Sequence, residues 1–337
     1  MRILVLGAGG TGGYFGGRLA QSGADVTFLV RPARAAQLDA KGLQLRSPLG
    51  DADLRVAHVT ADALPALATS QPFDMVLLSC KAYDLDSAMD AIAPAVGEHT
   101  WVLPILNGLR HYAPLDGRFG AQRVVGGLCF ISAMKGVDGE VRHLGQPASI
   151  TFGERHTDVD SPRTAAFADL CAQANIDHVR SMRIAREQWT KFTFLATLAA
   201  ATCVMRAPVG RIVAAQGGDA FVRALYAECL AVARAEGEPI DTPAQQAALG
   251  TLTAPGSPLK ASMLRDLEAG QAVEAMQIVG DMFLRARAAG MEAPMLATAW
   301  VHLQAYEAGR SAGRSARGPP WPRRSPGKRS APGASTA

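Results

Sequence analysis

A glycine-rich turn between a short apolar run and a helix-compatible segment constrains the fold of this chain most strongly. The turn reads Gly7-Ala8-Gly9-Gly10-Thr11-Gly12 and directly follows the apolar residues 3–6 of an expected strand over 2–6. Gly7 permits a tight turn, Gly9 lets the backbone approach a pyrophosphate, and Gly12 lets helix and strand pack closely. N–H groups at a helix start, together with the helix dipole, favour phosphate there. In this strand–turn–helix context the motif predicts a dinucleotide-binding site, although the turn alone would be a weak signal.

Apolar β-rich runs alternate with helical patterns over the first 180 residues, as a parallel sheet flanked by helices requires. The expected strands cover residues 2–6, 25–30, 43–46, 73–80, 101–106 and 123–131. A strand pair over 139–143 and 148–153 is expected to extend the sheet. The pattern therefore predicts an α/β Rossmann N-terminal domain over residues 1–180.

From residue 181 onward, helical periodicity replaces the β-rich runs, which predicts an all-α C-terminal domain over 181–308. The expected helices lie near 183–205, 217–236, 243–252, 261–268, 271–289 and 293–308. After Glu307 the composition changes to Gly, Ser, Arg, Pro and Ala without apolar periodicity. Residues 309–337 are accordingly expected to be a disordered basic tail, either an anion-binding segment or a non-native, frame-shifted end.

The charge and cysteine content exclude several classes of protein. Seven positive charges and no acidic residue occupy the last 28 residues, so removing them from the formal net charge of +4 leaves −3. A slightly acidic body predicts no nucleic-acid partner. Five widely spaced cysteines suggest neither a disulfide framework nor a metal centre. The longest apolar run, 192–205, is about 14 residues, shorter than the ~20 needed to cross a bilayer. A cytoplasmic enzyme without a membrane partner is expected.

The residue that follows the second expected strand bears on the choice of cofactor. In an NAD-binding unit an acidic residue there binds the ribose hydroxyls, whereas this strand ends Phe28-Leu29-Val30-Arg31. A guanidinium suits a phosphate, so Arg31 is the expected partner of a 2′-phosphate, with Arg34 as additional support. NADPH is therefore the predicted cofactor. The alternative is that Arg31 is only a solvated loop residue.

Three polar residues lie where ligands are expected to bind. Lys81 and Asn107 each follow an expected strand, and ligands of parallel sheets bind beyond the carboxyl ends of the strands. Lysine is scarce, six against 28 arginines, which favours a site role for Lys81, whereas Asn107-Gly108 could equally be a simple turn. Lys191 stands at the polar end of an apolar helix, where lost hydration would lower its pKa and suit general acid chemistry. The alternative is a lysine that only snorkels to solvent.

Taken in order, these motifs resemble those of the ketopantoate reductase (2-dehydropantoate 2-reductase) family over about residues 1–308. The matching set is the Gly7–Gly12 turn, Lys81-Ala82, Asn107-Gly108, Trp189-x-Lys191, Ser262-Met263-Leu264-Arg265-Asp266 and Glu274. The resemblance implies a Rossmann domain, a helical domain resembling that of 6-phosphogluconate dehydrogenase, and a site in the cleft between them.

The resemblance also implies roles for individual residues. Lys191 resembles the family's proton donor, Asn107 the residue that touches both nicotinamide and substrate, and Lys81 a lysine near both. Ser262 resembles the hydroxyl that holds the substrate carboxylate. Glu274 resembles a carboxylate that reaches the cofactor ribose or a site lysine. The implied reaction transfers a hydride from NADPH to C2 of 2-dehydropantoate and gives (R)-pantoate, a step of pantothenate biosynthesis.

Three positions depart from the pattern of members with ketopantoate activity, which commonly have asparagine there. This chain has Leu195, Ala199 and Val209. Because Leu195 and Ala199 follow Lys191 by one and two helical turns, an apolar pocket wall is expected. A more apolar 2-oxo acid or ketone is therefore an alternative substrate. A non-catalytic NADP-binding regulatory protein is an alternative of another class. The apolar helices also permit a homodimer.

Overall fold

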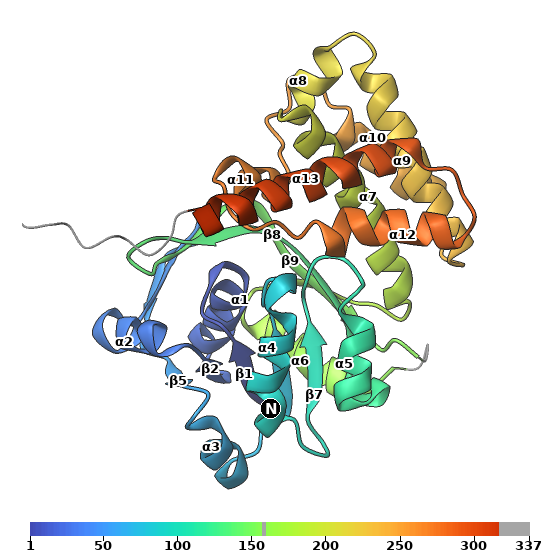
Figure 1. Cartoon of the computed structure of the whole chain (residues 1–337). Helices are drawn as coiled ribbons and strands as arrows, with labels where there is room; N and C mark the ends of the chain where they lie inside the picture. Colours follow the sequence, from blue (N-terminus) through green and yellow to red (C-terminus); the bar gives the residue numbers. More distant parts are fainter. Residues whose placement is uncertain (157–159, 317–337) are drawn as a thin grey trace, which may run out of the picture.

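The computed structural model describes residues 1–156 and 160–316. Its N-terminal part contains a five-stranded parallel sheet in the order β5-β2-β1-β6-β7. The strands are β1 (Arg2–Leu6), β2 (Asp25–Leu29), β5 (Ala57–Val59), β6 (Met75–Leu78) and β7 (Trp101–Pro104). The helices around this sheet are α1 (Gly10–Gln21), α2 (Pro32–Lys41), α3 (Leu64–Ser70), α4 (Leu85–Ile92) and α5 (Tyr112–Phe119) (Figure 1). The predicted Rossmann fold is confirmed.

The register of this sheet places the ends of its central strands side by side. Leu6 pairs with Leu29 and with Leu78, and Leu78 pairs with Pro104. The segments that follow β1, β6 and β7 therefore leave the sheet at one edge, which is where a parallel sheet binds its ligands. All residues of β6 and β7 are buried, as expected for strands covered on both faces.

A second sheet lies between the parallel sheet with its helices and the helices of the C-terminal part. The long strands β8 (Gly126–Lys135) and β9 (Val141–Gly153) form an antiparallel hairpin with an irregularity between Ile131 and Ala133. β9 also pairs in parallel with β3 (Leu43–Arg46) and β10 (Asp177–Arg180), and β4 (Ala52–Leu54) pairs with β3. α6 (Pro162–Gln173) precedes β10.

The second sheet corrects the sequence-based expectation. The predicted strands 139–143 and 148–153 are a single strand, because β8 pairs with both residues 141–143 and residues 148–153 and the chain between them stays extended. Residues 43–46, expected in the parallel sheet, belong to the second sheet instead. The three-residue strands β4 and β5 and the exposed strand β10 were not predicted. They are too short or too polar to show a period, and only pairing with a neighbour makes them strands.

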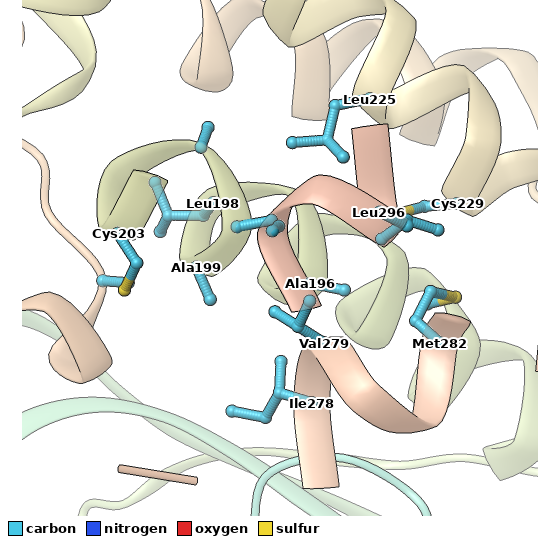
Figure 2. Close-up of a cluster of buried hydrophobic side chains, with 14 of the residues drawn as sticks. Ala196, Leu198, Ala199, Cys203, Leu225, Cys229, Ile278, Val279, Met282 and Leu296 are labelled. Carbon is cyan, nitrogen blue, oxygen red and sulfur yellow. The ribbon is translucent and has the colours of Figure 1, made fainter. Parts of the chain in front are cut away.

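From Ile184 onward the described chain is helical. Its elements are α7 (Ile184–Met205), α8 (Val209–Ala214), α9 (Gly218–Ala235), α10 (Thr242–Leu252), α11 (Ser262–Glu268), the π-helical η4 (Met276–Gly280), α12 (Asp281–Ala288) and α13 (Pro294–Ala316). The central helix α7 is buried along most of its length, and its small side chains let neighbours approach closely. Figure 2 shows Ala196 and Ala199 of α7 among apolar side chains of α9, η4, α12 and α13.

Two helix boundaries differ from the prediction. Residues 271–275 precede the π-helical turn η4 and are not helical, so the predicted helix 271–289 begins too early. The predicted tail is helical from 309 to Ala316, because α13 continues past Glu307. The helix can continue without an apolar face, because its backbone hydrogen bonds do not depend on one. The Glu307–Arg310 ion pair at 2.6 Å also spans one helical turn across the expected boundary. Residues 317–337 lie outside the described part of the chain.

Within residues 1–156 and 160–316, no helix is both long and apolar enough to cross a membrane. The 14-residue apolar run that ends α7 is instead covered by the other helices, as the complete burial of Ala199, Ala200 and Cys203 shows.

The burial of Ala199 gives a test of how this core is packed. We expect Ala199→Asn to lower the free energy of unfolding by about 2 kcal/mol or more, because the amide would be buried without a partner in a filled core. Urea unfolding followed by circular dichroism measures the change. Ala247→Asn, on the exposed face of α10, is the matched control and should cost only about 0.5 kcal/mol of helix propensity. Equal costs for the two substitutions would contradict the packing described here.

Candidate functional site

The glycine turn after β1 has the geometry of a phosphate cradle. Gly7 has a φ of +86°, in the left-handed region that favours glycine, and its N–H donates to the Leu29 carbonyl at 2.9 Å. A Cβ at Gly12 would clash with the Ser79 hydroxyl and lie 2.6 Å from the Gly7 carbonyl oxygen. A Cβ at Gly9 would meet no protein atom within 4 Å. The start of α1 thus presents open backbone N–H groups to an anion.

A cavity of about 800 Å³ adjoins this turn. Its lining includes the whole turn 7–12, the ends of β2 and β6, the segment 60–62 after β5, and one residue of the second sheet, Lys135. The volume lies within the range of cofactor sites. Position, size and backbone cradle therefore fit a dinucleotide whose pyrophosphate lies at the start of α1.

Two arginines that follow β2 line this cavity, and they differ in exposure and in hydrogen bonding. The Arg31 side chain is 82% exposed and pairs with Asp84 at 3.7 Å between Nη2 and Oδ2. Arg34 is buried, and its Nε donates to the Ala8 carbonyl at 3.2 Å while Nη1 donates to Gln37 Oε1 at 3.1 Å. Burial lowers the pKa of Arg34. The arginine expected only as support is therefore the one fixed against the glycine turn.

Lys191 lies at the junction of the sheets and the helices. Its side chain is 9% exposed. Its Nζ donates to the Cys129 carbonyl of β8 at 2.6 Å and to Asn107 Oδ1 at 3.3 Å. The ammonium also lies 5.3 Å from the centre of the Phe130 ring. Burial lowers the pKa of Lys191, and the negative charge of Glu274 partly opposes that effect.

A charged network extends from Asn107 through Glu274 to Lys81 and Asp266. Glu274 Oε1 accepts from the Ala82 N–H at 3.0 Å, and Oε2 accepts from Asn107 Nδ2 at 3.5 Å. Lys81 Nζ lies 3.8 Å from Glu274 Oε2 and 3.0 Å from Asp266 Oδ2. Burial works to lower the pKa of Lys81, but the Glu274 and Asp266 carboxylates outweigh it, so the pKa is raised. The two lysines therefore differ in how readily they lose a proton.

The structure brings together Lys81, Asn107, Lys191 and Glu274, which are distant in the sequence. Ser262 begins α11, one turn before Asp266. Its hydroxyl forms no hydrogen bond with the described residues. Gly108 is more than a turn residue, because a Cβ there would clash with the Gln277 carbonyl of η4. The Asn107-Gly108 pair therefore permits the close approach of the helical part to the loop after β7.

The three positions that lack the expected asparagines have different surroundings. Leu195 lines a small cavity of about 10 Å³ together with Lys191, Phe192 and the loop after β7. Ala199 and Val209 instead lie in the hydrophobic core of the helical part and line neither described cavity. The apolar pocket wall expected from Leu195 and Ala199 is therefore wrong for Ala199, because the surrounding helices cover that part of α7. Val209 begins α8 and is buried in the same core.

Several residues of the site carry no signal in a single sequence. The Cys129 carbonyl and the Phe130 ring reach Lys191 from a strand that looks like any other. Gln188 donates to the hydroxyl of Tyr112 and, at 3.3 Å, to the Gly127 carbonyl, which ties the start of α7 to the first half of the chain. Lys135 lines the nucleotide cavity, and only the scarcity of lysine could have singled it out.

Comparison with known proteins identifies the family. The family model "Ketopantoate reductase PanE/ApbA" matches residues 3–157, and its C-terminal counterpart matches residues 183–307. An uncharacterized oxidoreductase of Bacillus subtilis, YkpB, is 35% identical over 308 residues, which cover 91% of this chain and 99% of that protein. The 2-dehydropantoate 2-reductase of Mesorhizobium japonicum is 29% identical and covers 81% of this chain and 88% of its own length.

Solved structures agree with this result. The 2-dehydropantoate 2-reductase of Geobacter metallireducens has a TM-score of 0.81 and 30% identity, and the match covers 90% of this chain and 99% of that one. A D-mandelate dehydrogenase in complex with NADH and anilino(oxo)acetate shares the fold, with a TM-score of 0.79 at 20% identity over 92% of this chain and 99% of that one. The chain therefore belongs to the ketopantoate reductase family and is an NAD(P)-dependent oxidoreductase that acts on CH–OH groups.

Proposed function

We propose that this protein reduces the C2 carbonyl of a 2-oxo acid with NADPH, that 2-dehydropantoate is the first candidate substrate, and that Lys191 is the proton donor. The observation that carries the proposal is the buried Lys191 ammonium, held by Asn107 and the Cys129 carbonyl. In this view residues 1–180 bind the nucleotide, and residues 181–308 supply the catalytic lysine. Pantothenate biosynthesis is the pathway that this substrate implies.

The environment of Lys191 supports a role as a general acid. An ammonium that has lost much of its hydration gives up its proton more readily, and burial lowers the pKa of Lys191. Such a group can protonate a carbonyl oxygen as negative charge develops on it. Bound NADPH supplies the hydride from its nicotinamide ring. A protein that only binds nucleotide has no use for a buried, desolvated proton donor, which disfavours the regulatory alternative.

The network around Glu274 supports a positioning role. Glu274 accepts from Asn107 Nδ2, which turns the Asn107 Oδ1 toward Lys191. The same carboxylate fixes the Ala82 N–H beside Lys81. We infer that Asn107 and Lys81 contact cofactor and substrate, and that Ser262, at the start of α11, holds the substrate carboxylate.

For the cofactor, the proposed preference is NADPH. No acidic residue ends β2, and Arg31 and Arg34 both line the cavity beyond it. An arginine can bind a phosphate with two parallel hydrogen bonds, so the pair suits a 2′-phosphate. We infer that Arg31 binds this phosphate with Arg34 behind it.

A more apolar 2-oxo acid is the second candidate substrate. Leu195 stands one helical turn from Lys191 in the same small cavity, where an amide would pair with a substrate hydroxyl. Phe130 places an aromatic ring, 39% exposed, over the Lys191 ammonium. Both side chains favour an apolar substituent next to the reacting carbonyl.

The first test removes the proposed proton donor. We expect Lys191→Met to lower kcat by about 100-fold or more, the usual contribution of a positioned general acid. NADPH binding, measured by fluorescence titration, should persist, because the glycine turn is untouched. Lys260→Met removes a partly exposed lysine that pairs with Glu268, and it should leave kcat unchanged. Full activity of Lys191→Met would refute the assignment.

The second test uses pH. Because Lys191 acts in its protonated form, kcat/KM should fall as pH rises through its pKa, which burial holds below the ordinary 10.5. The negative charge of Glu274 raises the pKa of Lys191, so Glu274→Gln should move this alkaline limb to lower pH. Glu268→Gln, an equal charge change outside the site, should leave the limb in place. If Glu274→Gln left the alkaline limb of the pH profile in place, a group other than Lys191 would be responsible for that limb.

The third test separates the two candidate substrates. We expect Leu195→Asn to raise the ratio of kcat/KM for ketopantoate to that for 2-oxoisovalerate, which lacks the hydroxymethyl group, by about 10-fold or more. The new amide could pair with the substrate hydroxyl and would be poorly matched to the apolar analogue. Steady-state NADPH oxidation with both acids gives the ratio. An unchanged ratio would place the substrate side chain away from Leu195.

A further inference from the structure

The second sheet presses directly on the phosphate-binding turn. A Cβ at Gly10 would lie 2.6 Å from the Ala133 carbonyl oxygen of β8, and a Cβ at Gly13 would lie 2.7 Å from Val141 Cγ2 of β9. Figure 1 shows the β8–β9 hairpin passing over α1. The hairpin therefore lies against one side of the start of α1, next to the turn where the pyrophosphate of a dinucleotide is expected.

Lys135 is the last residue of β8 and extends this contact to the cavity. The register runs without a bulge from Ala133 to Lys135, which pairs with Val141. Alternate residues of a strand share a face, so Lys135 lies on the same face of the hairpin as Ala133. Its side chain is exposed and lines the cavity beside the glycine turn. The second sheet thus adds a cationic side chain to the wall of the cavity that the glycine turn also lines.

The three cationic side chains that line the cavity differ in whether other groups of the protein already pair with them. Arg31 pairs with Asp84, and Arg34 is bonded to the Ala8 carbonyl and Gln37. Lys135 forms no ion pair or side-chain hydrogen bond among the residues of 1–156 and 160–316. It is therefore the cavity cation that is most available to an incoming anion.

The position of Lys135 favours the pyrophosphate over the 2′-phosphate. A helix start offers about half a positive charge, which leaves most of the pyrophosphate charge without a counter-charge. The arginines that suit a 2′-phosphate follow β2, whereas Lys135 is two residues from the strand segment that touches Gly10. A compact ammonium can bridge phosphate oxygens as a point charge.

We propose that Lys135 binds the pyrophosphate of the nicotinamide dinucleotide together with the glycine turn, so that the second sheet contributes a residue to the phosphate site. The inference rests on dinucleotide binding by this family member and adds a residue outside the glycine motif. A contact to the pyrophosphate serves NADPH and NADH alike.

The test measures binding directly, without catalysis. We expect Lys135→Met to raise the Kd of both NADPH and NADH about 5- to 20-fold, the range of a partly exposed charge-assisted hydrogen bond. Titration of nucleotide fluorescence gives both constants. Arg31→Ala should weaken NADPH far more than NADH in the same assay. Added salt should weaken binding to the wild type more than to Lys135→Met.

Two further variants make the result specific. Lys135→Arg keeps the charge and should bind within about 3-fold of wild type. Lys41→Met removes a lysine of α2 that pairs with Asp138 beside the same hairpin but does not line the cavity, and should change neither Kd. Thermal melting shows whether each variant is folded. These controls separate a local contact from a general loss of positive charge.

Each other outcome overturns the proposal in a recognisable way. Unchanged Kd values in a folded Lys135→Met would show that Lys135 does not touch the dinucleotide. A loss confined to NADPH would assign Lys135 to the 2′-phosphate. If Lys41→Met weakened nucleotide binding as much as Lys135→Met, the effect would come from the overall positive charge of this face and not from a contact of Lys135. A wild type that binds neither nucleotide would overturn the proposed cofactor as well, whereas the first three results would leave it intact.

Discussion

A buried ammonium joins the two halves of this protein. Lys191 belongs to the long helix α7, but the oxygens that accept its hydrogen bonds belong to β8 and to the loop after β7. A charge removed from water is tolerated only when it is hydrogen-bonded, so the helix must dock in one register on the sheets. The hydrogen bonds of Gln188 to Tyr112 and Gly127 lie one turn earlier and hold that register. The geometry around Lys191 and the docking of the halves are one property of the structure.

Close backbone approaches make the rest of the site possible. The β8–β9 hairpin lies against the start of α1, and the π-helical turn η4 lies against Gly108. Neither approach would survive a side chain at the glycine involved. Glu274, two residues before η4, is thereby held within reach of Asn107 and Ala82. Irregular helical turns of this kind often occur at functional sites.

The charges of the site are arranged in two groups with different chemistry. Around the glycine turn the cations Arg31, Arg34 and Lys135 face a cavity large enough for a dinucleotide. Around Lys191 and Lys81, burial lowers the pKa of Lys191, whereas the carboxylates of Glu274 and Asp266 raise the pKa of Lys81. One lysine is thus suited to give up a proton and the other to remain a cation. Leu195 and Phe130 add apolar surface next to Lys191.

The sequence alone determined the parallel sheet, the glycine turn, the helical second half and four of the residues that meet, namely Lys81, Asn107, Lys191 and Glu274. These features rest on local patterns, namely strand and helix periodicity, turn chemistry and an ordered set of motifs. The tertiary structure decided what no local window contains. The bonds that assemble the site join residues 62 to 192 positions apart.

Only the fold shows that Arg34 is buried while Arg31 is exposed, and that Leu195 faces Lys191 while Ala199 and Val209 lie in the core. Likewise, pairing with β8 makes residues 141–153 one strand and brings Lys135 to the nucleotide cavity. The physical reason is common to all of these cases. Burial, the pKa of a lysine and the wall of a cavity depend on which distant segments pack together, and that packing is set by the whole chain.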